Sequence, residues 1–404
     1  MAVRRIERIE YLNKLIAFRD KKIMKIVVGV RRCGKSTLLE MYQDYLRDQG
    51  IEEEQIVTVN LEDFDHYELR DPAKLHEYIK GRLVEGKMTY IFLDEVQHCP
   101  EFPRVVDSLY LRENVDIYLT GSNAYMLSSE IATLISGRYV KISMLPLSFK
   151  EYVSSTGDND NLSRKYLTYL EESSFPYALE LKGQQREIKD YLEGIYSTIV
   201  VKDIASRKKI SDTMMLESIT RFIFDNVGNP LSTKKIADTM TSEGRKIDVK
   251  TVEKYLDGLL ESFVVYQAKR YNIKGRQYLK TQEKYYVVDI GMRYMMLGSR
   301  STDVGHILEN VVYLELLRGG FDVYVGKVGE LEVDFVAMDQ KKITYYQVAA
   351  TVRDESILCR ELAPLEKIND HYPKLILTLD EDPEGDYNGI RRINALDWLM
   401  GMTE

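Results

Sequence analysis

The first third of the chain alternates short apolar runs with stretches whose apolar residues recur at helical spacing. Residues 5–20 place Ile6, Ile9, Leu12, Leu15 and Ile16 on one side of a predicted amphipathic helix. Strands are predicted at the apolar run 26–28 and within the stretches 55–64, 89–97 and 115–124, and a helix is predicted near 72–84. Each strand runs into polar or glycine-containing residues, and the candidate chemistry lies in those residues.

The first of these strands leads into a loop with two glycines and then into a helix. The stretch Gly29–Thr37 has the pattern G-x-x-x-x-G-K-[ST], in which glycines let backbone N–H groups face phosphate oxygens. The positive end of the helix dipole strengthens this preference for phosphate. Lys35 would reach the β- and γ-phosphates of ATP, and the Ser36 hydroxyl would ligate Mg²⁺. The predicted nucleotide contacts are Gly29, Arg32, Cys33, Gly34, Lys35, Ser36 and Thr37.

In the stretch 89–97, four hydrophobic residues run into two acidic residues, which is a Walker B pattern. Asp94 would hold Mg²⁺, and Glu95 would act as the general base that polarises the attacking water. The buried strand predicted in 115–124 ends in polar residues, of which Ser122 or Asn123 would sense the γ-phosphate. A helix N-cap is the alternative role for Ser122. The predicted magnesium ligands are therefore Ser36 and Asp94.

Arg138 precedes the apolar stretch 139–145 and follows the predicted sensor strand. It is a candidate arginine finger, acting either on the nucleotide of its own chain or on that of a neighbouring subunit. An ordinary surface arginine is the equally weighted alternative. The predicted catalytic residues are thus Lys35, Glu95 and Arg138.

Four stretches of residues 1–155 resemble an AAA-type ATPase domain found in a large prokaryotic family: GVRRCGKST, YIFLDEVQ, YLTGSNA and SGRYVKISMLPLSFKEY. The resemblance implies a three-layer α/β fold around a central parallel sheet. It also implies a C-terminal domain of unknown function that is similar to PD-(D/E)xK nucleases. We therefore expect an ATPase domain at 1–155, a helical and winged-helix region at 156–284, and a nuclease-like α/β domain at 285–404.

Residues 231–280 have the pattern of a winged helix, with two capped helices followed by a β-hairpin that turns near Lys274 and Gly275. The hairpin, which we call the wing, contains no acidic residue between positions 269 and 280. Its cations are typical of a ribbon that follows phosphates. They are Lys269, Arg270, Lys274, Arg276 and Lys280. Weak DNA contact and a structural or partner-binding role are the two alternatives for this region.

The C-terminal part departs from the nuclease pattern that the resemblance implies. Glu309 and Asp334 stand where two acidic ligands are expected, but the third element is Gln347-Val348-Ala349 rather than an acidic residue and a lysine. Glutamine can ligate a metal through its carbonyl oxygen, whereas Ala349 cannot replace the lysine that activates water. The sequence therefore predicts a degenerate fold that does not cut nucleic acid.

Length, charge and composition limit the class of protein and the cellular compartment that we expect. The chain has 404 residues and a formal net charge of −8. No apolar stretch approaches the roughly 20 residues that span a bilayer. The three cysteines are few and odd in number, which favours a reducing cytoplasm. The 29 tyrosines are mostly dispersed, which predicts packing rather than a stacking platform.

These patterns predict a cytoplasmic, Mg²⁺-dependent ATPase that acts as a molecular switch, with an unidentified protein partner and with homo-oligomers permitted by the AAA resemblance. One alternative is a DNA-binding regulator or defence component gated by nucleotide. The other is an ATP-regulated nuclease.

Overall fold

The computed structural model describes residues 5–124, 135, 137–157, 161–298, 303–340 and 342–403. It divides into two compact units. The first comprises residues up to Pro146 together with Glu261–Phe263, and the second comprises Leu147–Leu260 and Val264–Glu404. Among the described residues, no helix is long and apolar enough to cross a membrane.

The first unit is built on a five-stranded parallel sheet. Its strands are β1 (Met24–Val28), β2 (Ile56–Asn60), β3 (Thr89–Asp94), β4 (Val115–Gly121) and β5 (Tyr139–Ser143). They lie in the order β2-β3-β4-β1-β5, and all four neighbouring pairs are parallel. Every residue of β1, β3 and β4 is buried, as expected of strands in a parallel sheet that is covered on both faces.

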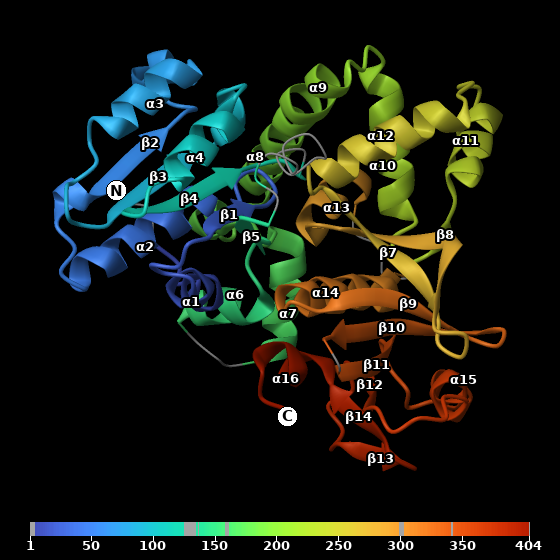
Figure 1. Cartoon of the computed structure of the whole chain (residues 1–404). Helices are drawn as coiled ribbons and strands as arrows, with labels where there is room; N and C mark the ends of the chain where they lie inside the picture. The colour runs from blue at the N-terminus through green and yellow to red at the C-terminus, as the bar shows by residue number, and fades with distance from the viewer. Residues whose placement is uncertain are drawn as a thin grey trace. The chain divides into compact units, whose positions relative to one another are not determined.

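Helices cover both faces of this sheet (Figure 1). On one face lie α1 (Ile9–Ala17) and α2 (Lys35–Asp48), and on the other lie α3 (Pro72–Lys80) and α4 (Phe102–Tyr110). Short helical turns, η1 (Glu53–Gln55), η2 (Phe64–Arg70) and η3 (Val96–His98), connect the main elements. The expected three-layer α/β fold around a parallel sheet is therefore confirmed.

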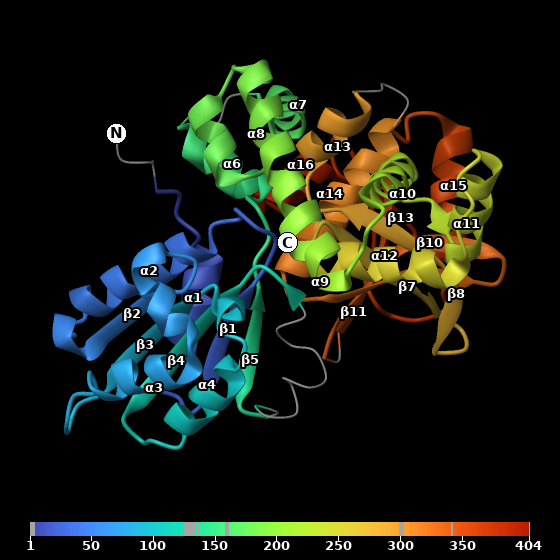
Figure 2. The same cartoon turned by 90° about the horizontal axis from the view of Figure 1, so that it is seen from above.

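The second unit begins with helices. They are α6 (Phe149–Thr156), α7 (Leu162–Glu172), η5 (Pro176–Leu181), α8 (Gln185–Thr198), the π-helix η6 (Ile199–Ala205), α9 (Ser206–Lys208) and α10 (Thr213–Asp225). Figure 2 shows α6, α7, α8 and α13 (Ile290–Leu297) gathered in one group. Residues 230–287 follow with β6 (Pro230–Leu231), α11 (Thr233–Ser242), α12 (Val249–Glu261), β7 (Val265–Asn272) and β8 (Gln277–Val287).

A nine-stranded mixed sheet runs through the rest of this unit, in the order β13-β14-β12-β11-β10-β9-β7-β8-β6. Its further strands are β9 (Asp322–Val328), β10 (Leu331–Asp339), β11 (Lys342–Ala349), β12 (Lys374–Thr378), β13 (Gly385–Tyr387) and β14 (Ile390–Asn394). The remaining helices are α14 (Val304–Arg318), α15 (Glu355–Glu366) and α16 (Ala395–Met400).

The two expected domain boundaries differ from the observed division. The boundary expected after residue 155 falls within α6, and the observed first unit ends at Pro146. The boundary expected between 284 and 285 falls within β8, and β7 pairs in parallel with β9, so the wing strands and the C-terminal strands share one sheet. The backbone hydrogen bonds of β8 therefore continue across the boundary expected between residues 284 and 285.

Candidate functional site

The loop between β1 and α2 has the backbone that its glycines predict. A Cβ at Gly29 would collide with the carbonyl oxygen of Met144, so the loop packs against the chain that leaves β5. Gly34 has φ 101° and lies at the N-cap of α2, and Arg32 also has a left-handed φ of 68°. Glycine adopts such a conformation without the steric cost that other residues carry. The loop therefore turns sharply into the N-terminus of α2.

Lys35 lies in the first turn of α2, and its side chain is only 3% exposed. Its ammonium lies 3.2 Å from the carbonyl oxygen of Gly29 and 3.3 Å from that of Val30. It also lies 3.5 Å from Oε1 of Glu95. Burial opposes the charge of Glu95, but Lys35 outweighs burial and holds the pKa of that carboxyl below its usual range. The predicted phosphate-binding lysine and the predicted base thus face each other as an ion pair.

Asp94 is the last residue of β3, and it lies beside two hydroxyls, one from the start of α2 and one from the adjacent strand β4. Ser36 of α2 and Thr120 of β4 both hydrogen-bond to its carboxylate, with Oγ1 of Thr120 donating to Oδ1. Burial nevertheless raises the pKa of Asp94 above its ordinary value. Hydroxyl and carboxylate oxygens are the hard donors that Mg²⁺ takes. The chemistry of this pair therefore fits the metal that the sequence predicts for Ser36 and Asp94.

Side chains at the end of β4 hold Glu95 in place. Glu95 has a left-handed φ of 51°, and its backbone N–H donates to Oγ1 of Thr120 at 2.9 Å. The amide of Gln97 donates to the Glu95 carboxylate and, at 3.3 Å, to Oγ of Ser122. Ser122 is buried and also hydrogen-bonds to Glu95. The predicted sensor thus lies next to the predicted base.

Thr120 and Gln97 are residues of this site to which the sequence analysis assigns no role. The available signal was their position, since each stands at or just beyond the carboxyl end of a buried parallel strand. Such ends meet at one edge of the sheet, where ligands of α/β folds bind.

Arg8 is a second omission. Arg8, to which the sequence analysis assigns no role, is buried and donates to the carbonyl oxygen of Cys33 at 3.0 Å and to that of Leu145 at 2.7 Å. It therefore ties the phosphate-binding loop to the chain that leaves β5. Cys33 itself is buried, and burial raises the pKa of its thiol. The Cys33 side chain points toward the carbonyl oxygen of Met144. Only the backbone of Cys33 would therefore make the predicted contact with nucleotide.

The proposed role of Arg138 on the nucleotide of its own chain is wrong. Arg138 precedes β5, and its carbonyl oxygen accepts the N–H of Met24 at the start of β1. The phosphate-binding loop follows the other end of β1, after Val28. The Arg138 guanidinium pairs with Asp107 and lies 5.5 Å from the ring centre of Tyr110. Because parallel strands start at the same edge, Arg138 lies at the edge opposite to Lys35. A role toward a neighbouring subunit stays a prediction.

The wing presents its cations unequally. Lys269, Lys274 and Arg276 are exposed, and the hairpin turns between Asn272 and Gln277 as expected. Arg270 instead is half-buried, donates to Gln282 at 3.0 Å and lies 3.6 Å from Glu332. The side chain of Lys280 lies outside the described part of the structure. The described wing therefore offers three of the five predicted cations to solvent.

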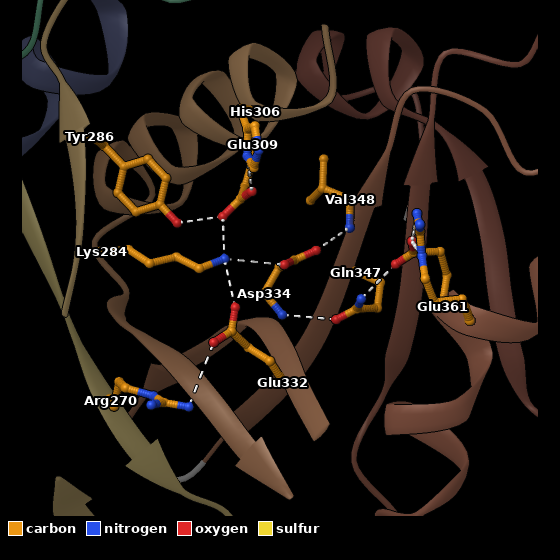
Figure 3. Close-up of polar contacts among 11 residues, drawn as sticks. Arg270, Lys284, Tyr286, His306, Glu309, Glu332, Asp334, Gln347, Val348 and Glu361 are labelled. Carbon is orange, nitrogen blue, oxygen red and sulfur yellow. Dashed lines mark hydrogen bonds and ion pairs between the residues drawn. The ribbon is translucent and has the colours of Figure 1, made fainter. Parts of the chain in front are cut away.

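Glu309 and Asp334 do come together in the second unit, around a lysine that the sequence analysis did not connect with them (Figure 3). The Lys284 ammonium lies 2.9 Å from Oε1 of Glu309, 2.9 Å from Oε1 of Glu332 and 3.5 Å from Oδ1 of Asp334. Tyr286 donates to the same Glu309 oxygen at 2.6 Å. We call Lys284, Glu309, Glu332 and Asp334 the lysine cluster. It lines a pocket of about 610 Å³.

The lysine cluster is buried, so its charges depend on one another. Burial opposes the charge of Lys284, but Glu309, Asp334 and Glu332 outweigh it and raise the pKa of the ammonium. Burial also opposes the charge of Glu309, yet Lys284 holds the pKa of that carboxyl below its usual range. Burial and the charge of Glu309 raise the pKa of Asp334 to about 7. One ammonium thus serves three acidic groups.

Gln347 does not present a free carbonyl oxygen to the lysine cluster. Its Oε1 accepts the backbone N–H of Asp334 at 2.8 Å, and its amide donates to Glu361 at 2.7 Å (Figure 3). Within the described ranges, no group of three or more His, Cys, Asp or Glu side chains has the arrangement of a metal site. Both ends of the Gln347 amide are thus engaged by neighbouring groups of the chain.

We expect the second unit not to cut nucleic acid. Position 349 carries alanine, and the Lys284 ammonium remains protonated because three acidic groups raise its pKa. A protonated lysine cannot take a proton from water. The measurement is incubation of the full chain with plasmid, single-stranded DNA and RNA in Mg²⁺ or Mn²⁺. Cleavage that disappears in Asp334→Ala would contradict this expectation.

Comparison with known proteins matches two parts of the chain to family models. Residues 21–153 match a family model described as "AAA domain", and residues 163–303 match one described as "Domain of unknown function (DUF8612)". An uncharacterized protein of Haemophilus influenzae is 38% identical over 399 residues, which is 98% of each chain. One of Methanocaldococcus jannaschii is 28% identical over 386 residues, 89% of this chain and 82% of the relative.

Among solved structures, a Walker-type ATPase of Pyrococcus abyssi has 13% identity and a TM-score of 0.47, and the match covers 72% of this chain and 96% of that one. A likeness at this level adds nothing to the assignment, which rests on the family models and on the Haemophilus relative. The chain belongs to the family of AAA-type P-loop ATPases in which a domain of unknown function follows the AAA domain.

Proposed function

We propose that the chain binds ATP at the loop between β1 and α2 and hydrolyses it to ADP and phosphate. The observation that supports this most directly is the approach of Lys35 and Glu95 to 3.5 Å, with Ser36 and Asp94 beside them. A phosphate-binding cation, a base and a pair of metal ligands are the parts that phosphoryl transfer to water requires.

The roles follow from charge and position. Backbone N–H groups of Arg32–Ser36 and the Lys35 ammonium bind the β- and γ-phosphates. Ser36 and Asp94 hold Mg²⁺, which neutralises charge on the phosphate oxygens when it is bound. Glu95 stays ionised because Lys35 lowers its pKa, so its carboxylate accepts the proton of the attacking water. The water oxygen bonds to the γ-phosphorus, the bond to the β-phosphate oxygen breaks, and ADP leaves.

We further propose that nucleotide occupancy acts as a switch. Gly29 packs against Met144, and Arg8 bridges Cys33 to Leu145. Residues 144–146 are also the covalent exit from the first unit toward the second. A conformational change of the phosphate-binding loop would therefore be transmitted through these contacts to residues 144–146.

Replacement of Lys35 with alanine should abolish ATP binding, because the variant loses the buried cation that faces the phosphates. The measurement is calorimetric titration with ATP and Mg²⁺. Lys80→Ala is the matched control, since Lys80 is a half-exposed surface lysine of the same unit. Unchanged ATP affinity in Lys35→Ala would remove the loop from the proposed site.

We propose nucleic-acid contact by the wing as a second function, supported by the exposure of Lys269, Lys274 and Arg276. Residues 230–287 have the order of helices and strands of a winged helix. Affinity for duplex DNA should be weak and fall with salt, with a log–log slope of roughly −3 or shallower for at most three phosphates. Fluorescence anisotropy at several salt concentrations measures this slope. Charge reversal at Lys274 and Arg276 should flatten it while ATP binding is retained.

A further inference from the structure

Three tyrosines of the wing region form a contiguous group, although most tyrosines of the chain are dispersed. Tyr271 of β7, Tyr278 of β8 and Tyr324 of β9 come from three adjacent strands. The ring centres of Tyr271 and Tyr278 are 5.5 Å apart, those of Tyr278 and Tyr324 are 5.2 Å apart, and those of Tyr271 and Tyr324 are 6.0 Å apart. We call this group the tyrosine triad.

Strand register places the tyrosine triad on one face of the sheet. Tyr271 is paired with Tyr278 across the hairpin, and it neighbours Gly326 on β9, two residues from Tyr324. Side chains two residues apart on a strand point to the same face. Arg270 and Lys284 belong to the opposite face, where they reach Glu332 (Figure 3). The triad is therefore separate from the lysine cluster.

Two rings of the tyrosine triad pack against the apolar core of the sheet, and the third is exposed to solvent. Tyr271 and Tyr324 are half-buried and pack against the apolar core of the sheet. Tyr278 is 62% exposed, so a large aromatic ring is held out to solvent next to two others. An exposed aromatic group of this kind, set on a packed base, offers a flat face for another ring.

The charges around the triad identify the kind of ring that fits. Lys274 and Arg276 are exposed and precede Tyr278 by four and two residues, and no acidic residue occurs between positions 262 and 282. Asp322, on the strand of Tyr324, is the acidic neighbour of that tyrosine. Exposed cations in the turn that precedes an exposed aromatic ring match a ligand that carries planar rings on a chain of phosphates.

We propose that the tyrosine triad binds single-stranded nucleic acid, with an unpaired base stacked on Tyr278 and adjacent phosphates on Lys274 and Arg276. Bases within a duplex are already stacked on one another and cannot offer a face to a side chain, so the strand must be single. This inference rests on the nucleic-acid contact proposed for the wing, and it adds the base as the group that is recognised.

The experiment compares three probes by fluorescence anisotropy with the full chain: a dT oligonucleotide, an abasic oligonucleotide of the same length, and a duplex. The abasic probe keeps the phosphates and lacks the bases. We expect the dT probe to bind more tightly than the abasic probe. Tyr278→Ala should weaken dT binding by at least about fivefold, the lower end of what one stacked base contributes, and leave abasic binding unchanged.

Matched variants separate stacking from charge. Tyr278→Phe should retain dT binding, because it keeps the ring. Tyr177→Ala should have no effect, since Tyr177 is 45% exposed and lies 5.3 Å from the ring of Tyr191 in another part of the same unit. Lys274→Glu with Arg276→Glu should weaken both single-stranded probes alike.

Two results would overturn the inference in distinguishable ways. Equal affinity for the dT and abasic probes, unaffected by Tyr278→Ala, would reject stacking while phosphate contact by the wing survives. Absence of binding to any probe at low salt would reject both proposals and leave the triad as a surface for a protein.

Discussion

Replacing Glu95 with glutamine is expected to slow ATP hydrolysis by at least about 10²-fold, the contribution of a lost general base, while ATP still binds. Glutamine keeps the shape of the side chain and still accepts a hydrogen bond from Gln97, but it cannot take a proton from water. Phosphate release under saturating ATP measures the rate, and calorimetry measures the affinity.

A surface glutamate provides the control for this variant. Glu101 follows the same segment after β3 and pairs with Arg104 in solvent, so Glu101→Gln should hydrolyse ATP like the parent chain. Turnover at the parent rate in Glu95→Gln would exclude Glu95 as the base and leave only nucleotide binding for the site.

Replacing Lys284 with methionine is expected to destabilise the second unit by about 3–5 kcal/mol, the cost of removing one partner from a buried ion pair. Three acidic groups would lose the ammonium that serves them all. Urea unfolding of the full chain, followed at a signal from the second unit, measures the loss. Lys327→Met is the control, because Lys327 is partly exposed and pairs only at 3.8 Å with the exposed Glu330.

The loss in Lys284→Met should grow with pH. Asp334 already has a folded pKa of about 7, above its ordinary value, so its contribution to stability is present at acidic pH and is lost as pH rises through 7. Without the ammonium, the pKa of Glu309 is no longer held down and rises as well, so the folded variant binds extra protons. Its free energy of unfolding should therefore fall further below that of the parent at pH 8 than at pH 5. A loss independent of pH would show that the cluster's charges are not the cause.

In the first unit, Lys35 and Ser36 lie beside Asp94 and Glu95 as the two motifs predict, and each motif is a contiguous run of residues. The spacing from Gly29 to Thr37 determines a loop and a helix start within nine residues, and Asp94 with Glu95 ends a strand whose apolar run is unmistakable. Strand direction explains the error at Arg138. The candidate chemistry follows β1, β3 and β4, whereas Arg138 precedes β5 and so lies at the other edge of a parallel sheet.

The lysine cluster could not be predicted in the same way. Lys284 lies 25 residues from Glu309 and 50 residues from Asp334, and no local spacing relates them. The structure supplies Lys284 from β8, because the wing strands join the C-terminal sheet through the pairing of β7 with β9.

That pairing has a consequence for how the chain emerges during synthesis. The β7–β8 hairpin is complete at residue 287, but β9, which pairs with the free side of β7, begins only at Asp322. Until β9 arrives, one side of β7 is an open strand edge, which readily pairs with other chains and aggregates. Lysine residues on an edge strand discourage such pairing. Lys269 and Arg270 lie on that strand and Lys274 lies in the turn after it, and we expect these cations to discourage pairing of the nascent edge.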